Sequence, residues 1–416
     1  MATDGFTQVD PERAQEKAES LAAVRSVLAD VLDRDGGWAE LAGAGLLGLA
    51  VPEEYGGEGL GLPEVALLLR ETGTRARHLP VWETLCCGAL VVAGAGTDEQ
   101  QRALLPGVVS GELLLTPAFR EAGRPVSATP ATTYADGRVT GRKVAVTYAD
   151  TASRLLVPAM RGDHPVVALV DVSDPGVTLL ESGSSAGLTT HTVVLDGARA
   201  ELLGESAPRL LAERYVAGLC LTAAGVVAGA RDLTASYIKG RTQFGRSLAE
   251  FQAVAMQIAD VYISSRTLDL AAENAAWRLD QGLDVGDDLA VAAYWTCTEA
   301  PPALRTCHHL HGGMGVDETY PLHHYFSWVT DITHLLDVRA EAVAVEDPTT
   351  KNLELTRSQR AFKTEMRDYF TRLAGHNEHR EMALDRHGEV YQRVVRQMGQ
   401  DGKMGVGWPI CRTTRW

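Results

Sequence analysis

Histidines gather beside a cysteine in the later part of the sequence, and both residue types can bind metal ions. The group comprises Cys307, His308, His309, His311, His323, His324 and His334. Their spacing does not support a metal site, because no H-E-x-x-H pattern and no C-x-x-C pair is present. All six cysteines are scattered along the chain, which indicates reduced and mostly buried thiols. We therefore predict no metal site.

Three glycine-containing motifs follow one another along the chain. Val-Pro-Glu-Glu-Tyr-Gly-Gly occupies residues 51–57, Arg-Thr-Gln-Phe-Gly occupies 241–245, and His-Gly-Gly-Met-Gly occupies 311–315. Together they resemble, in order and position, the motifs of the acyl-CoA dehydrogenase family, and the resemblance covers about residues 20–340. It implies an α+β fold that is mostly α: an N-terminal all-α domain, a middle antiparallel β domain and a C-terminal four-helix bundle.

The resemblance also implies that the second and third motifs bind FAD, which carries a pyrophosphate and an adenine. Arg241 would supply a fixed cation, and Gly312 and Gly313 would let backbone N–H groups approach the phosphates. Phe244 would lie against the adenine, and Gln252 offers both a donor and an acceptor. In the family these motifs reach the adenosine half of the FAD held by a neighbouring subunit. The alternative is that Phe244 belongs to the core and the glycines merely end a helix. The predicted FAD-binding residues are Arg241, Phe244, Gln252, His311, Gly312, Gly313, Gly315 and Thr147.

Two family motifs that flank the isoalloxazine ring are altered. The Thr-Glu-Pro-x-Ala-Gly-Ser run corresponds to residues 116–123, where the pattern is degraded. The Lys-x-Trp-Ile-Thr motif corresponds to residues 143–147. There Thr147, which by resemblance faces the flavin, is kept, whereas Ala145 replaces the tryptophan. These changes argue against a complete isoalloxazine pocket within this chain.

The catalytic base of the family is also missing. Family chemistry is the α,β-dehydrogenation of a thioester, in which a carboxylate removes the α-proton while hydride leaves the β-carbon for flavin N5. The two family positions for this glutamate correspond to Leu336 and Tyr215. Glu213 and Asp337 are the nearest acids, but an offset of one residue turns a helical side chain by about 100°. Both acids are more simply read as solvated charges on a helix surface.

The elements that would hold these residues fall into blocks. Helical periodicity predicts an N-terminal helical domain over 17–112 and a helical bundle over 207–345. Between them, residues 113–206 hold short runs rich in Val and Thr that are cut by turns, as is typical of antiparallel strands. Residues 1–16 are predicted to form a flexible N-terminus and 346–352 a linker.

Small residues and turn residues give two more specific expectations. Alanine and glycine recur between residues 217 and 230, which predicts close packing of two helices. Tyr-Ala-Asp-Gly at 134–137 and Asp196-Gly197 each follow or precede a Val- or Thr-rich run, and both predict hairpin turns.

Composition excludes several classes of protein. The 416 residues are 45% hydrophobic, close to a globular average, which excludes a collagenous, disordered or coiled-coil chain. A formal net charge of −15 argues against nucleic-acid or anionic-membrane partners. No apolar run reaches the roughly 18 residues of a membrane span, and the N-terminus has no apolar signal core. We expect a soluble, cytoplasmic protein.

The end of the chain differs in charge from the rest. Residues 351–416 carry a net charge of +5, whereas the first 350 residues carry −20. Residues 353–409 resemble the start of a second copy of the N-terminal domain, and Met398 to Pro409 echoes Leu41 to Pro52. The resemblance stops after Pro409. We expect 353–416 to be a truncated second N-terminal helical domain, produced by truncation or a reading-frame change near Pro409.

Further stretches narrow the resemblance to one subfamily. Residues 261–270, 286–289, 300–303 and 307–315 resemble the base-lacking subunit of heteromeric actinobacterial acyl-CoA dehydrogenases, which act on CoA-activated steroid side chains such as that of cholesterol. The tail resembles the start of their base-bearing subunit. The resemblance implies a heterotetramer with a base-bearing partner, an acyl-CoA substrate and electron-transfer flavoprotein as acceptor. Two alternatives remain: a self-sufficient homomeric dehydrogenase that uses Glu213 or Asp337, and a flavin-free acyl-CoA-binding scaffold.

Overall fold

The computed structural model describes residues 11–34, 36–337, 357–375, 378 and 388–401. Residues 10–345 form one compact unit, and residues 346–416 together with 1–9 form another. The predicted linker at 346–352 lies outside the described residues, as do residues 1–10 of the predicted flexible N-terminus at 1–16. The first helix begins at Pro11, ahead of the start expected at residue 17.

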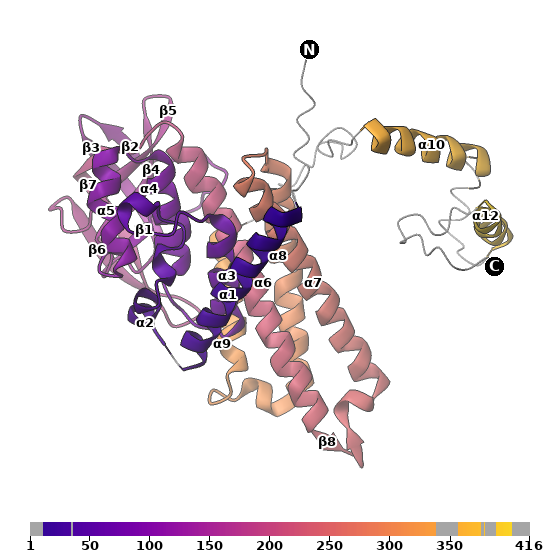
Figure 1. Cartoon of the computed structure of the whole chain (residues 1–416). Helices are drawn as coiled ribbons and strands as arrows, with labels where there is room; N and C mark the ends of the chain where they lie inside the picture. The colour runs from indigo at the N-terminus through magenta and orange to yellow at the C-terminus, as the bar shows by residue number, and fades with distance from the viewer. Residues whose placement is uncertain (1–10, 35, 338–356, 376–377, 379–387, 402–416) are drawn as a thin grey trace. The chain divides into compact units, whose positions relative to one another are not determined.

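Helices of 6 to 23 residues make up the first part of the larger unit (Figure 1). They are α1 (Pro11–Asp33), α2 (Trp38–Gly43), α3 (Leu62–Thr74), a π-helix (Val81–Ala89), α4 (Leu90–Ala95) and α5 (Asp98–Val109). The start of α5 follows from a local capping box. The Thr97 hydroxyl accepts the Gln100 N–H, and the Gln100 side chain accepts the Thr97 N–H. This pairing satisfies donors that a helix N-terminus leaves unbonded.

Seven strands follow, and most of them close into a ring. They are β1 (Leu115–Pro117), β2 (Thr133–Ala135), β3 (Arg138–Thr147), β4 (Arg154–Arg161), β5 (His164–Asp171), β6 (Val177–Gly183) and β7 (Thr189–Leu202). Pairing runs β4-β2-β3-β7-β5 and returns to β4, while β6 adds to β7. The ring encloses its own apolar cluster. β1 and β2 run parallel to β4, so the domain is mostly but not wholly antiparallel. No hairpin joins either strand to β4, which leaves both free to pair in parallel.

One of the two predicted hairpin turns is confirmed and the other is wrong. Asp136 and Gly137 have φ of 50° and 75°, and Ala135 pairs with Arg138 across them, as in a two-residue hairpin. Asp196 and Gly197 instead lie inside β7, where the register against β3 shifts and Gly197 has φ of 63°. Glycine adopts this conformation without steric cost, so β7 absorbs an extra residue as a bulge and continues.

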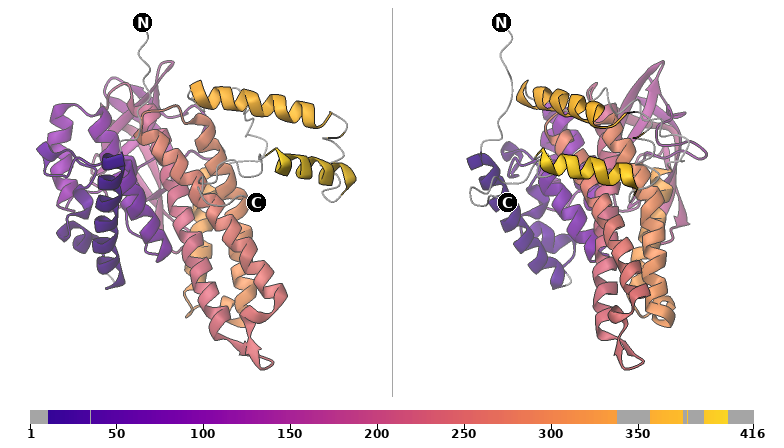
Figure 2. Two further views of the ribbon diagram at one scale, coloured as in Figure 1. Left: turned by 45° about the vertical axis from the view of Figure 1, so that its right-hand side comes forward. Right: turned by 90° about the vertical axis from the view of Figure 1, so that its right-hand side faces the viewer.

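Four long helices complete the larger unit (Figures 1 and 2). They are α6 (Ala207–Gly240), α7 (Gln252–Asp280), α8 (Gly286–His311) and α9 (Leu322–Leu336). A small hairpin of β8 (Thr242–Gln243) and β9 (Arg246–Ser247) joins α6 to α7 at the tip of the bundle. The predicted order of helical domain, β domain and helical bundle is confirmed.

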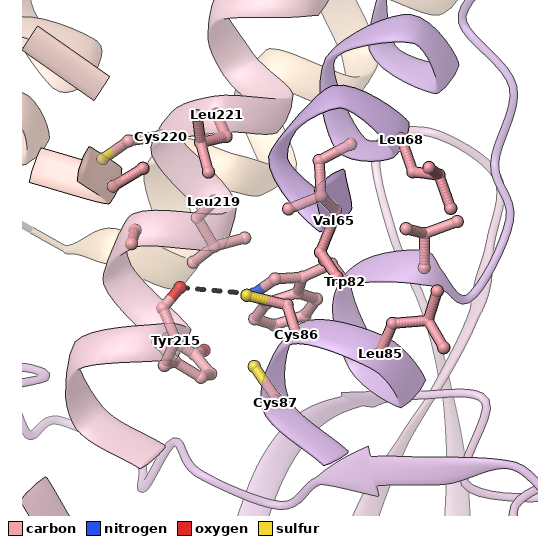
Figure 3. Packing of buried hydrophobic residues seen from close by; sticks show 14 of the residues in the cluster. Val65, Leu68, Trp82, Leu85, Cys86, Cys87, Tyr215, Leu219, Cys220 and Leu221 are labelled. Atoms are coloured by element: carbon pink, nitrogen blue, oxygen red, sulfur yellow. Dashed lines mark hydrogen bonds between the residues drawn. The ribbon is translucent and has the colours of Figure 1, made fainter. Parts of the chain in front are cut away.

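Helix α6 packs against α3 at backbone distance. A Cβ on Gly225 would lie 2.2 Å from the Arg70 carbonyl oxygen, and one on Gly229 would lie 2.1 Å from that of Thr74. Only glycine permits this approach, so the predicted close packing of α6 is confirmed. Near the start of α6, Trp82 of the π-helix donates its indole N–H to the Tyr215 carbonyl oxygen at 3.2 Å (Figure 3).

Among the described helices, α6 is the one that is long and apolar enough to cross a membrane, judged by length and composition alone. Most of its apolar window, 72%, is buried inside the protein. Its hydrophobicity is therefore accounted for by its central place in the fold.

The smaller unit contains α10 (Arg357–Leu373) and α12 (Glu389–Gln400). The Tyr369 hydroxyl donates to Asp401 at 2.7 Å, and Arg393 pairs with Glu378 at 2.7 Å. Phe362 and Phe370 on α10 are 42% and 37% exposed. Residues 402–416, which include most of the stretch that echoes residues 41–52, lie outside the described residues.

Candidate functional site

A cavity of about 280 Å³ lies where the N-terminal helices, the β domain and the bundle meet. Each of the three parts supplies polar side chains to its wall. The polar residues in the wall include His78 and Glu83 before and within the π-helix, and Arg120 after β1. They also include Thr147 and Tyr148 at the end of β3, and Asp331 and His334 on α9. Trp82 and Trp328 add apolar surface. A concave apolar site with a few convergent polar groups is the usual form of a ligand site.

A bulge at the end of β3 directs residues toward this cavity. The register of β3 against β7 shifts between Lys143 and Val146, and Ala145 has φ of 54°. A left-handed conformation at a residue other than glycine costs free energy and persists only where the surroundings enforce it. Here the Val144 N–H donates to the Arg120 carbonyl oxygen at 2.9 Å. The bulge thus places Ala145 and Thr147 on the cavity wall.

Glu83 is a buried acid in this wall, and sequence reasoning missed it. The Thr147 hydroxyl donates to Glu83 Oε1 at 2.6 Å, and the Glu83 residue is 5% exposed. Burial raises the pKa of Glu83 to about 7, against the opposing effect of the hydrogen bond from Thr147. A carboxyl group that titrates near neutral pH is suited to proton transfer. The signal that was available is a lone glutamate inside an otherwise apolar run at 79–96.

The pKa of Glu83 predicts a pH-dependent stability. Its usual pKa is 4.5, so between about pH 4.5 and 7 the folded chain binds a proton that the unfolded chain has released. We expect the Glu83 contribution to the free energy of unfolding to fall by about 3 kcal/mol over that interval, at 1.36 kcal/mol for each pKa unit, while His78, whose pKa burial lowers to about 4, contributes in the opposite direction. Urea unfolding from pH 4.5 to 8 measures this. The free energy of unfolding of the wild type minus that of the uncharged Glu83→Gln variant should fall by this amount from pH 4.5 to 8, and a difference that does not depend on pH would refute the assignment.

Both acids named from the sequence are engaged in ion pairs. Asp337, which caps α9, pairs with Arg120 at 2.9 Å, and Glu213 on α6 pairs with Arg209 at 3.0 Å. Neither carboxylate lines the cavity. Leu336 and Tyr215, at the two family positions for the base, are both 1% exposed. The acids in the cavity wall are therefore Glu83 and Asp331, and neither predicted candidate is among them; Asp331 accepts the N–H groups of Ser185 and Ala186.

Arg120 separates this cavity from a second one of about 360 Å³ that lies along residues 119–130. Its Nη2 pairs with Asp337, whereas its Nη1 is buried with no hydrogen-bond partner among the described residues. The guanidinium stands in the altered motif 116–123, which by resemblance would flank an isoalloxazine ring.

A buried ion pair fixes this altered motif to β3. Lys143 is 0% exposed, and its Nζ lies 2.8 Å from Glu121 Oε1. The Glu121 carboxylate also accepts the N–H groups of Ala131 and Thr132 and the Thr132 hydroxyl. Burial would raise the pKa of Glu121, but these donors and Lys143 hold it at about 2.

The residues predicted to contact adenosine lie at the other end of α6. Arg241 follows the last turn of α6, Phe244 lies at the hairpin tip, and Gln252 begins α7 (Figure 1). Phe244 is 92% exposed, so the alternative that it belongs to the core is wrong. Within the described chain, the Arg241 guanidinium makes no hydrogen bond or ion pair.

The glycine turn that follows α8 is held at the same end. The His311 ring is buried, and its nitrogens lie 2.8 Å from the Cys307 carbonyl oxygen and 3.1 Å from the Tyr320 hydroxyl. It stacks on Tyr237 of α6, with ring centroids 4.4 Å apart. His311 therefore positions the turn, and both of its ring nitrogens already have hydrogen-bond partners within the protein.

Three glycines of this turn differ in what surrounds them. Gly312, with φ of 57°, and Gly313 are exposed, and a Cβ on either would meet nothing within 4 Å. A Cβ on Gly315 would lie 2.6 Å from the His308 carbonyl oxygen, so Gly315 closes the turn. The exposed Gly312-Gly313 backbone is open to a phosphate that approaches from outside.

The structure thus divides the predicted FAD-binding residues into two places. Arg241, Phe244, Gln252 and the glycine turn share one end of the bundle, whereas Thr147 lies in the cavity. Along α6, Thr222 at the cavity and Arg241 are about 28 Å apart, at 1.5 Å per residue.

Only the adenosine end fits its expected ligand. It offers the Arg241 guanidinium, the exposed Phe244 ring and the open backbone of Gly312 and Gly313. These groups could bind the adenosine half of a FAD that another subunit holds. In the cavity, Ala145 stands where the resemblance expects a tryptophan, and the Thr147 hydroxyl donates to Glu83, so two of the contacts expected for an isoalloxazine ring are replaced.

The clustered histidines serve the packing of the bundle end. His308 Nδ1 lies 2.7 Å from the Gly315 carbonyl oxygen, and His323 Nδ1 lies 2.8 Å from that of Tyr320. In the described part of the chain, no three His, Cys, Asp or Glu side chains are placed to hold a metal ion.

Two domain models of one family match the chain. The model for the N-terminal domain of acyl-CoA dehydrogenases matches residues 12–112, and the model for the C-terminal domain matches 209–332. Among individual proteins, the chain is 43% identical to the acyl-CoA dehydrogenase FadE28 of Mycobacterium tuberculosis over 317 residues, 76% of this chain and 92% of FadE28. It is 32% identical to FadE27 of the same organism, over 70% of this chain and 81% of FadE27.

Solved structures give the same picture. A variant described as the Tcur3481-Tcur3483 steroid ACAD superposes with a TM-score of 0.72 at 37% identity, over 78% of this chain and 94% of the matched chain. The ChsE4-ChsE5 complex from Mycobacterium tuberculosis superposes with a TM-score of 0.69 at 29% identity, over 77% and 93%. Butyryl-CoA dehydrogenase from Megasphaera elsdenii, at 19% identity and a TM-score of 0.69, is similar in fold.

Proposed function

The chain belongs to the acyl-CoA dehydrogenase family, oxidoreductases that act on the CH–CH bond of acyl-CoA, and we propose that it is the base-lacking subunit of a heteromeric, FAD-dependent member. In this proposal a homologous subunit supplies the catalytic carboxylate and holds FAD. The present chain completes that FAD site from outside and is catalytic only within the complex.

One observation carries the proposal: Arg241, Phe244 and Gln252 are present and exposed, while the two family positions for the base hold Leu336 and Tyr215. A self-sufficient enzyme would need the same adenosine-end residues and, in addition, its own base and flavin wall. The alternative that relies on Glu213 or Asp337 loses support, because both are ion-paired outside the cavity.

Relatives support a heteromer and a steroid substrate. One similar structure is described as the ChsE4-ChsE5 complex, and another, whose description joins the two names Tcur3481 and Tcur3483, is described as a steroid ACAD. We propose CoA thioesters of steroid side chains, such as that of cholesterol, as substrates in preference to straight-chain thioesters. We further propose a cytoplasmic location, lipid and steroid catabolism as the setting, and electron-transfer flavoprotein as the electron acceptor.

Flavin content tests this function directly. The reconstituted complex should contain two copies of each subunit and two FAD, measured by native mass and by flavin absorbance. Arg241→Ala should lower the retained FAD, because it removes a charge-assisted contact to the pyrophosphate. Four FAD per tetramer, or an unchanged FAD content in the variant, would contradict the proposal.

A matched variant controls for general charge effects. Lys239 lies in the last turn of α6, exposed and two residues from Arg241. Lys239→Ala removes the same unit of charge from the same end of the bundle without touching the predicted phosphate contact. FAD retention should therefore be unaffected. If the chain alone and the complex both lacked flavin, the scaffold alternative would be favoured instead.

A further inference from the structure

Phe119 and Arg120 form a partition between the two cavities of the larger unit. Among the described residues, Arg120 is the one that lines both cavities, and Phe119 lines the second. The Arg120 side chain is 12% exposed, so its guanidinium lies inside the protein between the cavities. The partition therefore separates a space of about 280 Å³ from one of about 360 Å³.

Each side chain of the partition is held by a different helix. The Phe119 ring stacks on Tyr215 of α6, with ring centroids 4.3 Å apart and planes 26° apart. The Arg120 guanidinium pairs at 2.9 Å with Asp337 at the end of α9, and Asp337 is the partner that the described surroundings provide. A guanidinium is always charged, so moving it away from this carboxylate into an apolar space would cost free energy.

The backbone of the partition is fixed as well. The Arg120 carbonyl oxygen accepts the Val144 N–H at 2.9 Å, which joins the partition to the bulge of β3. The next residue, Glu121, is joined to β3 by its buried pair with Lys143 at 2.8 Å. Neither side chain of the partition can therefore turn aside for a ligand without breaking a contact.

The partition stands where a substrate would react. By the resemblance, the α-carbon of an acyl thioester lies beside the family base positions, which hold Tyr215 and Leu336 here. Phe119 stacks on the first of these residues, and Arg120 pairs with the residue that follows the second. In an acyl-CoA the acyl group and the pantetheine arm leave the thioester in opposite directions. A ligand of this shape at the base positions would need both cavities and would collide with the partition.

We propose that Phe119 and Arg120 exclude acyl-CoA thioesters from this chain's own cavities, so that substrate binds only in the partner subunit. The inference rests on the proposed function, in which the partner carries the base. A thioester bound in the present chain would be unproductive, because neither base position holds an acid. Tyr215 and Asp337, at one base position and directly after the other, are positioning residues that hold the partition closed.

Binding to the full chain alone, without partner or flavin, tests the proposal. The probes are CoA and its butanoyl, hexanoyl, octanoyl and decanoyl thioesters, titrated by isothermal calorimetry. For the wild type, affinity should not depend on the length of the acyl chain. In Phe119→Ala/Arg120→Ala the cavities join, and affinity should rise about fourfold for each methylene that becomes buried. Asp337→Asn keeps both side chains of the partition but removes the charge that holds Arg120, and it should give a smaller rise.

Arg124→Ala is the matched control for the loss of a positive charge. Arg124 lines the second cavity and not the first, so this variant leaves the partition in place. It should bind the probes as the wild type does, with no dependence on chain length.

Two results would overturn the proposal. The first is wild-type affinity that rises with chain length, which would favour the acyl-CoA-binding scaffold. The second is affinity independent of chain length in a double variant whose far-UV circular dichroism matches the wild type. If the double variant does not fold, the same comparison is made with Asp337→Asn. The FAD content of the heteromeric complex, which tests the proposed function, does not enter these titrations.

Discussion

The purified chain on its own is expected to leave acyl-CoA thioesters unoxidised. Its two family base positions hold Leu336 and Tyr215, and the acids beside them are ion-paired. Loss of a general base typically lowers the rate by about 10²–10⁴-fold. The incomplete flavin wall at Ala145 lowers it further. A dye-reduction assay with steroid-side-chain and straight-chain CoA thioesters, run with and without the base-bearing partner, measures this.

Three variants would identify the carboxylate responsible for any residual activity of the chain alone. Glu83→Gln, Glu213→Gln and Asp337→Asn each remove one carboxylate while keeping the size of the side chain. Activity of the chain alone that disappeared in Glu83→Gln would identify the buried acid of the cavity as a base. Activity that disappeared in either of the others would restore the self-sufficient alternative. Background rates in all four proteins are the expected result.

The second large effect concerns the buried pair of Lys143 and Glu121. Lys143→Met should reduce the free energy of unfolding by up to about 3–5 kcal/mol, because it leaves the buried Glu121 carboxylate with only the half-exposed Arg124 guanidinium, 3.7 Å away, as a cation. The Nζ–Oε1 distance of 2.8 Å and the full burial of the lysine place this pair among those where removal of one partner is most costly. Urea unfolding at neutral pH measures the change.

A double variant separates charge from packing. In Lys143→Met/Glu121→Gln neither charge of the pair remains buried, and the amide oxygen can still accept one of the two N–H groups of Ala131 and Thr132. Its stability should therefore lie closer to that of the wild type than to that of Lys143→Met. If Lys143→Met cost less than about 1 kcal/mol, the pair would be no more important than an exposed one.

Features set by local sequence were predictable. The long helices α6 and α7 follow from periodicity that extends over many turns, and the turn at Asp136-Gly137 follows from the backbone preferences of two residues. The resemblance to acyl-CoA dehydrogenases, carried by three short motifs in order, is confirmed by matches to both domain models.

Features set by tertiary packing were not predictable. Asp196-Gly197 has the composition of a hairpin turn, but the pairing of β7 with β3 on one side and β6 on the other keeps the strand continuous. Glu83 acquires its raised pKa from burial, and the Thr147 hydroxyl that partly opposes this shift reaches Glu83 from a bulge more than sixty residues away in sequence. Neither the bulge nor the π-helix has a periodicity that sequence alone reveals.

The backbone contact between α3 and α6 has a consequence for how this chain can vary. Gly225 and Gly229 seat α6 against carbonyl groups of α3, so the helix cannot slide along its axis without a clash. Past these glycines it runs unbroken to Arg241. An insertion or deletion of one residue in that stretch would swing Arg241 by about 100° and shift it by about 1.5 Å. The number of residues between Gly229 and Arg241 therefore sets where the Arg241 side chain lies and points. We expect this number to be kept, whereas surface loops can change in length.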